Sequence, residues 1–184
     1  MRKKFLFAVT VSICIFLASE ACHAGLVKKD SSSRWRDWIG SKQGYLYKVE
    51  AFIERGDEIV IEQNADLEEA ISSKDKILGE GAIAQTSGKL SAIIDALQAL
   101  APPEGFTEYH AKIVEAYTYK RLANDATLSK ALLKIRDYSH KAMSSEIEAM
   151  EALRRIYIDH GAPNAIINSI DRNIAAYRQK LVLN

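Results

Sequence analysis

Two adjacent prolines, Pro102 and Pro103, separate two amphipathic segments in the middle of the chain. The segment before them carries apolar residues every three or four positions, the spacing that places side chains on one face of a helix: Leu90, Ile93, Ile94, Leu97 and Leu100. Proline ends this helix because it lacks a backbone N–H and disfavours helical geometry at the residue before it. The segment after them repeats the spacing at Phe106, Tyr109, Ile113 and Tyr117. So short a connection predicts two antiparallel helices that pack against each other.

The same spacing extends over most of the chain and predicts an all-α fold. The expected helices are Tyr45–Ile71 (continuous across Gly56), Ala82–Ala101, Glu104 to about Leu122, Leu128–His160 and Ile166–Leu181. A turn is expected at residues 72–81, and whether the helical pattern breaks at Asn124–Thr127, with Asp125 or Thr127 as the N-cap of a new helix, is left open. Gly161 and Pro163 form the glycine-then-proline stop of a helix C-terminus. No segment alternates like a strand, so we expect one domain, residues 41–184, folded as an antiparallel bundle of four or five helices.

Residues 1–24 have the pattern of a cleaved secretory signal peptide. Three basic residues at positions 2–4 precede an apolar run over positions 5–18, and Ala21 and Ala24 offer cleavage sites. The run is shorter than the roughly 20 apolar residues of a spanning helix, which favours a signal over an anchor. Cleavage after Ala24 is expected, and the protein is expected to be periplasmic or secreted.

The alternative cut, after Ala21, would leave Cys22 at the N-terminus and raise the question of a lipoprotein. Ser19 and Glu20 match the lipoprotein signal poorly, so lipidation is the less favoured outcome. Cleavage after Ala24 removes Cys14 and Cys22, the only two cysteines of the chain, and leaves a domain without disulfides or thiol chemistry.

Charge excludes some partners at the level of the whole chain. The sequence has 25 basic and 24 acidic residues, and the expected cleavage removes three of the former and one of the latter, leaving 22 against 23. Such a balance, with both signs interspersed, predicts no preference for nucleic acid or anionic membranes.

Residues 25–40 are expected to form a flexible polar leader that contains both tryptophans, Trp35 and Trp38. With Arg34 and Arg36 beside them, these indoles could lie on a membrane surface or a partner. Alternatively, they close one end of the bundle, which we favour because so short a segment has little membrane affinity alone. Membrane contact is expected only through the signal or this segment.

The stretch LQALAPPEGFTEYHAKIVEAY joins a leucine-rich helix, a Pro-Pro stop and the pair Tyr109-His110. It resembles a group of secreted bacterial helical-bundle proteins in which this hinge has the form L-x-x-L-x-P-P followed by Y-H. The resemblance covers residues 90–117 closely and the rest of the chain only in its helical layout. Those proteins have no agreed activity, so the resemblance implies an exported helical bundle and no catalysis.

Motifs for catalysis and for metal binding are incomplete. The sequence has no G-x-S-x-G, and no cysteine nucleophile remains after cleavage. A di-iron bundle needs two Glu-x-x-His pairs, and the nearest approach is the single pair Asp137 and His140. We therefore expect no enzyme activity, no cofactor and no metal.

Two functions remain open for such a chain. The first is a non-catalytic binding or interaction module of the cell envelope, which binds a protein partner or self-associates. The second is a small-ligand or metal-binding bundle with a pocket between helices, lined by Tyr109, His110, Tyr117 and His140, whose rings would orient a ligand. A closed apolar core favours the first function, and a cavity into which these groups point favours the second. For His110 alone, a surface position at the start of a helix is favoured.

The signal peptide gives the first prediction. N-terminal sequencing of the protein recovered outside the cytoplasm should begin at Gly25, because small residues precede that bond. A lipid-modified Cys22, or an intact Met1 in the membrane fraction, would contradict it.

Overall fold

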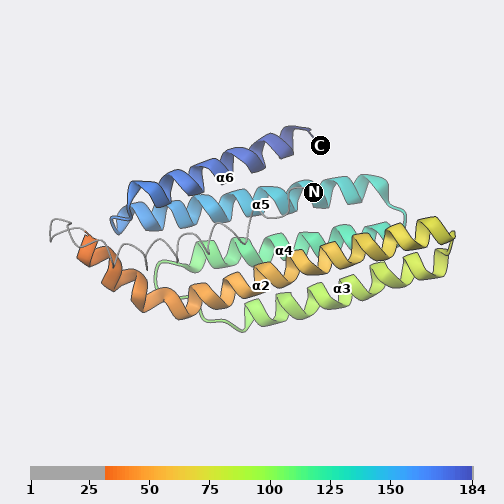
Figure 1. Cartoon of the computed structure of the whole chain (residues 1–184), viewed down its shortest axis with the longest axis horizontal. Helices are drawn as coiled ribbons and strands as arrows, with labels where there is room; N and C mark the ends of the chain where they lie inside the picture. Colours follow the sequence, from red (N-terminus) through yellow and green to blue (C-terminus); the bar gives the residue numbers. More distant parts are fainter. Residues whose placement is uncertain (1–31, 184) are drawn as a thin grey trace.

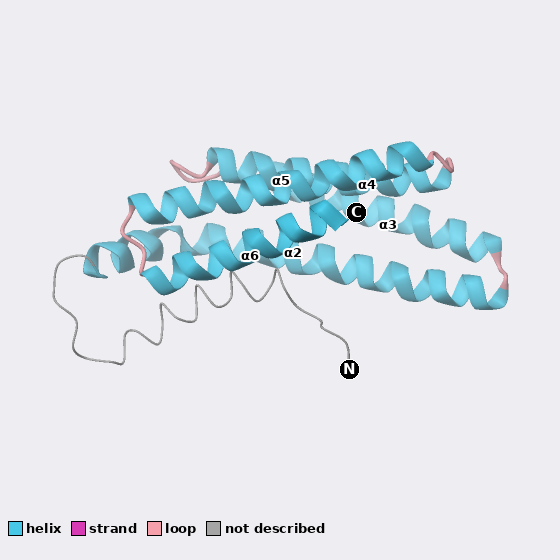
Figure 2. Cartoon of the chain, turned by 90° about the horizontal axis from the view of Figure 1, so that it is seen from above, coloured by secondary structure: helices cyan, strands magenta, loops and turns pink. Residues whose placement is uncertain are grey.

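The computed structural model describes residues 32–183, and within this range the chain forms five α-helices and no strand. They are α2 (Ser32–Ser73), α3 (Lys76–Gln98), α4 (Thr107–Leu128), α5 (Leu132–Asp159) and α6 (Asn164–Leu183). Consecutive helices run in opposite directions, as Figures 1 and 2 show. The predicted all-α antiparallel bundle is confirmed, with five helices. The expected signal peptide, residues 1–24, lies outside the described residues.

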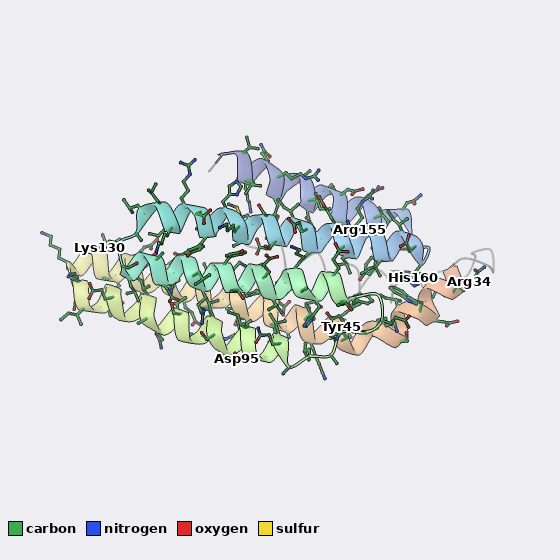
Figure 3. The ribbon with its side chains drawn as sticks, turned by 180° about the vertical axis from the view of Figure 1, so that it is seen from behind. Arg34, Tyr45, Asp95, Lys130, Arg155 and His160 are labelled. Atoms are coloured by element: carbon green, nitrogen blue, oxygen red, sulfur yellow. The ribbon has the colours of Figure 1, made fainter. Side chains whose placement is uncertain are left out.

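The bundle is a long rod with two different ends. The start of α2 lies at one end with the α3–α4 and α5–α6 connections; we call this the aromatic end. The α2–α3 and α4–α5 turns lie at the opposite end, where Lys130 projects in Figure 3, far from Arg34 and His160. We call residues 71–78 and 128–134 the tip. None of the helices in residues 32–183 is long and apolar enough to cross a membrane.

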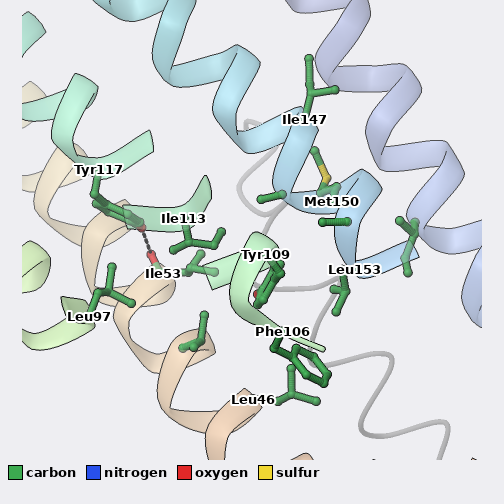
Figure 4. Packing of buried hydrophobic residues seen from close by; sticks show 14 of the residues in the cluster. Leu46, Ile53, Leu97, Phe106, Tyr109, Ile113, Tyr117, Ile147, Met150 and Leu153 are labelled. Carbon is green, nitrogen blue, oxygen red and sulfur yellow. Dashed lines mark hydrogen bonds between the residues drawn. The ribbon is translucent and has the colours of Figure 1, made fainter. Parts of the chain in front are cut away.

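Helix α4 lies at the centre of the packing. It contacts α3 on one side and α5 on the other, while α2 packs on α3 and α6 packs on α5. The apolar rows predicted on either side of the double proline meet in one buried cluster, in which Leu97 and Phe106 are completely buried and Ile113 is nearly so (Figure 4). The prediction that these two helices face each other is therefore confirmed, although α4 begins at Thr107 rather than at Glu104, after Gly105 takes a φ of +86°.

The expected flexible leader is wrong from Ser32 onward, because helix α2 already begins there. Trp35 is 3 % exposed and packs edge-to-face on Tyr157 with ring centroids 5.0 Å apart. Trp38 stacks on His160 at 3.9 Å and on Phe106 at 5.8 Å. These aromatic contacts hold the first turns of α2 against the bundle, so the favoured interpretation, in which both indoles close one end, is confirmed.

The predicted turn at residues 72–81 is shorter in the structure, and the stretch Asn124–Thr127 is helical. Asp75 caps α3 by accepting a hydrogen bond from the Leu78 N–H at 3.0 Å, so α3 begins at Lys76 and not at Ala82. The open question at Asn124–Thr127 is answered by a continuous helix: α4 runs through these residues to Leu128, and the Asn124 side chain bonds to neighbouring helices. The predicted continuity across Gly56 and the stop at Gly161, which has a φ of +74°, are confirmed.

The buried hinge gives the second prediction. Replacing Leu97 with alanine should lower the free energy of unfolding by about 2–5 kcal/mol, because the side chain is fully buried and leaves a cavity. Chemical denaturation measures the change. Leu133→Ala is the matched control, since Leu133 is 87 % exposed and should change stability by less than about 0.5 kcal/mol. Equal effects of the two substitutions would show that the hinge is not core.

Candidate functional site

The four residues expected to line a pocket do not form one group. Tyr109, His110 and Tyr117 are buried on α4, whereas His140 is exposed on α5. The two cavities described below are lined by other residues. Asp137, the acidic partner suggested for His140 in a metal site, binds Lys141 at 2.8 Å. Within residues 32–183, no group of three or more histidine, cysteine or acidic side chains is placed to hold a metal ion.

His110 connects three helices, so the expected surface position is wrong. Its Nδ1 lies 3.0 Å from the Tyr45 hydroxyl of α2, and the ring also bonds to the backbone of Leu97 at the end of α3. A carbonyl can only accept, so the ring donates to Leu97 and Nδ1 accepts from Tyr45. The imidazole therefore adds a side-chain donor to the Leu97 carbonyl at the end of α3, which also accepts from the Leu100 N–H at 3.0 Å. Burial lowers the pKa of His110 below its ordinary value of 6.5, and the bond to Leu97 opposes part of that shift.

Tyr117 of α4 makes a close contact and a hydrogen bond with α2. Its hydroxyl donates to the Ile53 carbonyl at 3.1 Å, as the dashed line in Figure 4 shows, and burial raises its pKa to about 12. The ring lies directly over Gly56, where any added Cβ would overlap it. The glycine inside the long helix is thus explained by this close approach.

Lys120 and Glu146 form an ion pair inside the bundle. Their side chains are 22 % and 10 % exposed, and the ammonium lies 2.6 Å from Glu146 Oε1 and 4.6 Å from the centre of the Tyr117 ring. Burial opposes the charge of Lys120, but the Glu146 carboxylate outweighs it, and the pKa of Lys120 is raised overall. Burial likewise raises the pKa of Asp57, while Lys120 lowers it. The ammonium of Lys120 is thus paired with Glu146 and also lies close enough to Asp57 to favour its charged form.

Asn124 completes a series on α4. Its amide nitrogen donates to the Ile83 carbonyl at 2.7 Å and to Ser87 at 2.8 Å, and its oxygen accepts from Gln63 at 2.5 Å. We call the series the polar row: His110, Tyr117, Lys120 and Asn124. Each member has its partner on another helix, so these groups are satisfied within the protein and their arrangement is structural.

A second charged cluster lies between α5 and α6. A hollow of about 450 Å³ is lined by Glu151, Arg154, Arg155, Asp171, Ile174 and Arg178. Each arginine is paired: Arg154 with Asp171 at 2.5 Å, Arg178 with Glu151 at 2.5 Å, and Arg155 with Glu108 at 2.6 Å. Such exposed pairs contribute little to stability, and they leave no unmatched guanidinium for an anionic ligand.

The tip is where the bundle exposes its apolar side chains. Of the eleven large hydrophobic residues that are exposed within residues 32–183, six lie in its two turns. These six are Ile71, Ile77, Leu78, Leu128, Leu132 and Leu133. Four of the six, Ile71, Ile77, Leu132 and Leu133, have exposed fractions between 76 % and 87 %, so little of each side chain is covered by the bundle.

A groove joins the two turns of the tip. It has a volume of about 380 Å³, and its lining includes the apolar residues Leu67, Ala70 and Ile83 and the charged residues Lys74, Glu80 and Lys130. Because the α2–α3 turn and the α4–α5 turn both contribute, this groove exists only in the folded bundle.

Both turns of the tip place a lysine in the left-handed backbone region. Lys74 has a φ of 56° and Lys130 a φ of 53°, each just past the end of a helix. The backbone bonds are those of a Schellman turn: the N–H groups of Asp75 and Ala131 donate to the carbonyls of Ala70 and Ala126. Glycine is preferred at such a position, because a side chain there costs about 1 kcal/mol. The α3–α4 and α5–α6 connections do use glycine, at Gly105 and Gly161.

Sequence reasoning missed both the tip and the charged residues inside the bundle, Asp57, Lys120 and Glu146. Asp57, Lys120 and Glu146 were detectable as charged residues in phase with apolar rows, since Ile53, Tyr117 and Met150 lie three or four positions from them on their helices. The tip was not detectable, because averaging charge over the whole chain hides a local excess that only folding creates.

Comparison with known proteins assigns no family: no protein-family model, no curated protein and no solved structure matches the chain. The resemblance of residues 90–117 to secreted helical bundles therefore stays a prediction.

The buried imidazole gives the third prediction. Since the pKa of His110 is lower in the folded than in the unfolded state, its contribution to stability is full above pH 6.5 and declines as the pH falls below it. His110→Gln should therefore show a smaller loss of unfolding free energy between pH 7.5 and pH 5.5 than the unchanged protein. His140→Gln, at an exposed site, is the control and should keep the original pH dependence. Identical pH dependence in the His110 variant would contradict the buried neutral imidazole.

Proposed function

We propose that this protein is a non-catalytic interaction module of the cell envelope that binds its partner through the tip. The observation that carries this proposal is the presence of six exposed aliphatic side chains in the two turns of the tip, two of which, Ile71 and Leu128, line the groove between the turns. Contiguous exposed apolar surface on a folded domain is typical of an interaction site. The proposed location of the protein in the cell envelope rests on the expected signal peptide.

The polar interior supports a scaffold rather than a ligand-binding bundle. Two of the groups expected to orient a small molecule in the core are bonded to other helices: His110 to Tyr45 and Leu97, and Tyr117 to Ile53. Binding a ligand there would break these bonds, and a buried polar group left unpaired costs about 1–3 kcal/mol. The interaction-module function therefore accounts for the described residues better than the pocket lined by Tyr109, His110, Tyr117 and His140.

Site-specific photocrosslinking in the native host gives the fourth prediction. A benzophenone amino acid at Ile77, in the tip, should give abundant adducts, whereas the same group at Ala92, exposed on the flank of the same helix, should give few. Mass spectrometry of the adducts reports whether the captured molecule is a protein or a lipid.

The matched loss variant is Leu132→Ser with Leu133→Ser. Both side chains are largely exposed, so folding should be unaffected while the adducts at Ile77 decrease. Equal adduct yields at Ile77 and Ala92 would contradict the proposal. One equivalent of a small molecule or metal retained in native mass spectrometry would favour the ligand-binding bundle instead.

A further inference from the structure

The charge of the tip is as distinctive as its apolar surface. Its fifteen residues, 71–78 and 128–134, contain four lysines and one acid, Asp75. Asp75 is occupied in capping α3, and Lys76 pairs with Glu80 at 3.3 Å in an exposed contact. Within residues 32–183, no ion pair joins Lys74, Lys130 or Lys134 to an acid. The end of the rod is thus positive, although the chain as a whole is nearly neutral.

We infer that the tip binds an anionic phospholipid bilayer end-on, with its aliphatic side chains entering the interface and its lysines contacting the headgroups. This inference rests on the proposed function and names the partner of that same surface. Apolar side chains rimmed by lysines provide the two attractions that hold a protein at an anionic membrane, apolar burial and electrostatic attraction.

The composition of the tip favours a bilayer over a protein partner. Protein interfaces are enriched in aromatic residues, methionine and arginine and depleted in lysine. The fifteen residues of the tip have no methionine and no arginine, and they have four lysines. A second copy of the chain, docked tip to tip, would bring the lysines of both copies together, and like charges disfavour that contact.

The backbone of the tip supports the same inference independently. Lys74 and Lys130 occupy left-handed positions that glycine fills at the aromatic end. A glycine at either place would relieve the backbone, so the two lysines are not explained by folding. Both line the groove, where an anionic headgroup would meet them.

A fluorophore at the tip tests this inference in the full chain. Cys14 and Cys22 are first changed to serine; Ile77→Cys then carries an environment-sensitive nitrobenzoxadiazole label, and Ala92→Cys carries it in the control. Vesicles of phosphatidylglycerol mixed with phosphatidylcholine should shift the emission of the Ile77 label to the blue and leave the Ala92 label unchanged. Because the readout is local, association of residues 1–31 with vesicles does not imitate it.

The double variant Lys74→Gly with Lys130→Gly separates binding from folding. Glycine suits both backbone positions, so the unfolding midpoint should be unchanged or higher, while the affinity for the anionic vesicles falls about 25-fold, at about fivefold per lysine. Lys48→Gln with Lys141→Gln removes two lysines from the flanks of α2 and α5 and should change this affinity much less.

Several outcomes would overturn the inference: no blue shift at Ile77, an equal shift with phosphatidylcholine alone, an equal shift at Ala92, or unchanged affinity in the glycine variant. If crosslinking at Ile77 in the host captures a protein while the vesicles give no shift, the interaction module stands and the lipid partner is rejected. If neither experiment gives a signal at Ile77, both proposals fail.

Discussion

The polar row of α4 is the constraint on which the rest of the bundle depends. Its members bond to α2, α3 and α5, which are the helices that surround α4. Apolar rows alone tolerate sliding and rotation of one helix against another, whereas a buried donor or acceptor has one partner at one position. A shift of one turn would leave His110, Lys120 and Asn124 unpaired together. The apolar core therefore supplies the driving force for association, and the polar row selects the register.

The fold could be predicted from the sequence wherever apolar periodicity and backbone chemistry agree. Pro102–Pro103 and Gly161 mark real helix ends, and the row through Leu97 is core. The errors occur where a polar side chain has a tertiary partner. The stretch Asn124–Thr127 resembles a helix break until Ser87 and Ile83 are seen to bind Asn124, and the polar stretch before Trp35 resembles a leader until Tyr157 is seen to cover the indole. Partners that lie far away in the sequence are invisible to a local pattern.

The candidate site was less predictable than the fold, for a related reason. The chemistry of Tyr109, His110 and Tyr117 predicts a ligand pocket, yet in the structure that chemistry serves packing. Conversely, Ile77 and Leu133 are ordinary aliphatic residues at helix ends, and only the meeting of two turns makes them a surface. The identity of a residue predicts what it can bind, whereas the fold decides whether it is free to do so.

The two ends of the rod differ in whether local residue preferences and packing agree. At the aromatic end, Trp38 and His160 stack over the core, and the turns use glycine at their left-handed positions, so local preference and packing agree. At the tip, the left-handed positions hold lysine and the aliphatic side chains are left uncovered, so both preferences are violated at the same place. Violations of local rules that are not compensated within the fold are expected at functional sites. Since the same sequence obeys these rules at its other end, the tip is the part of the described molecule whose residues are best explained by something outside it.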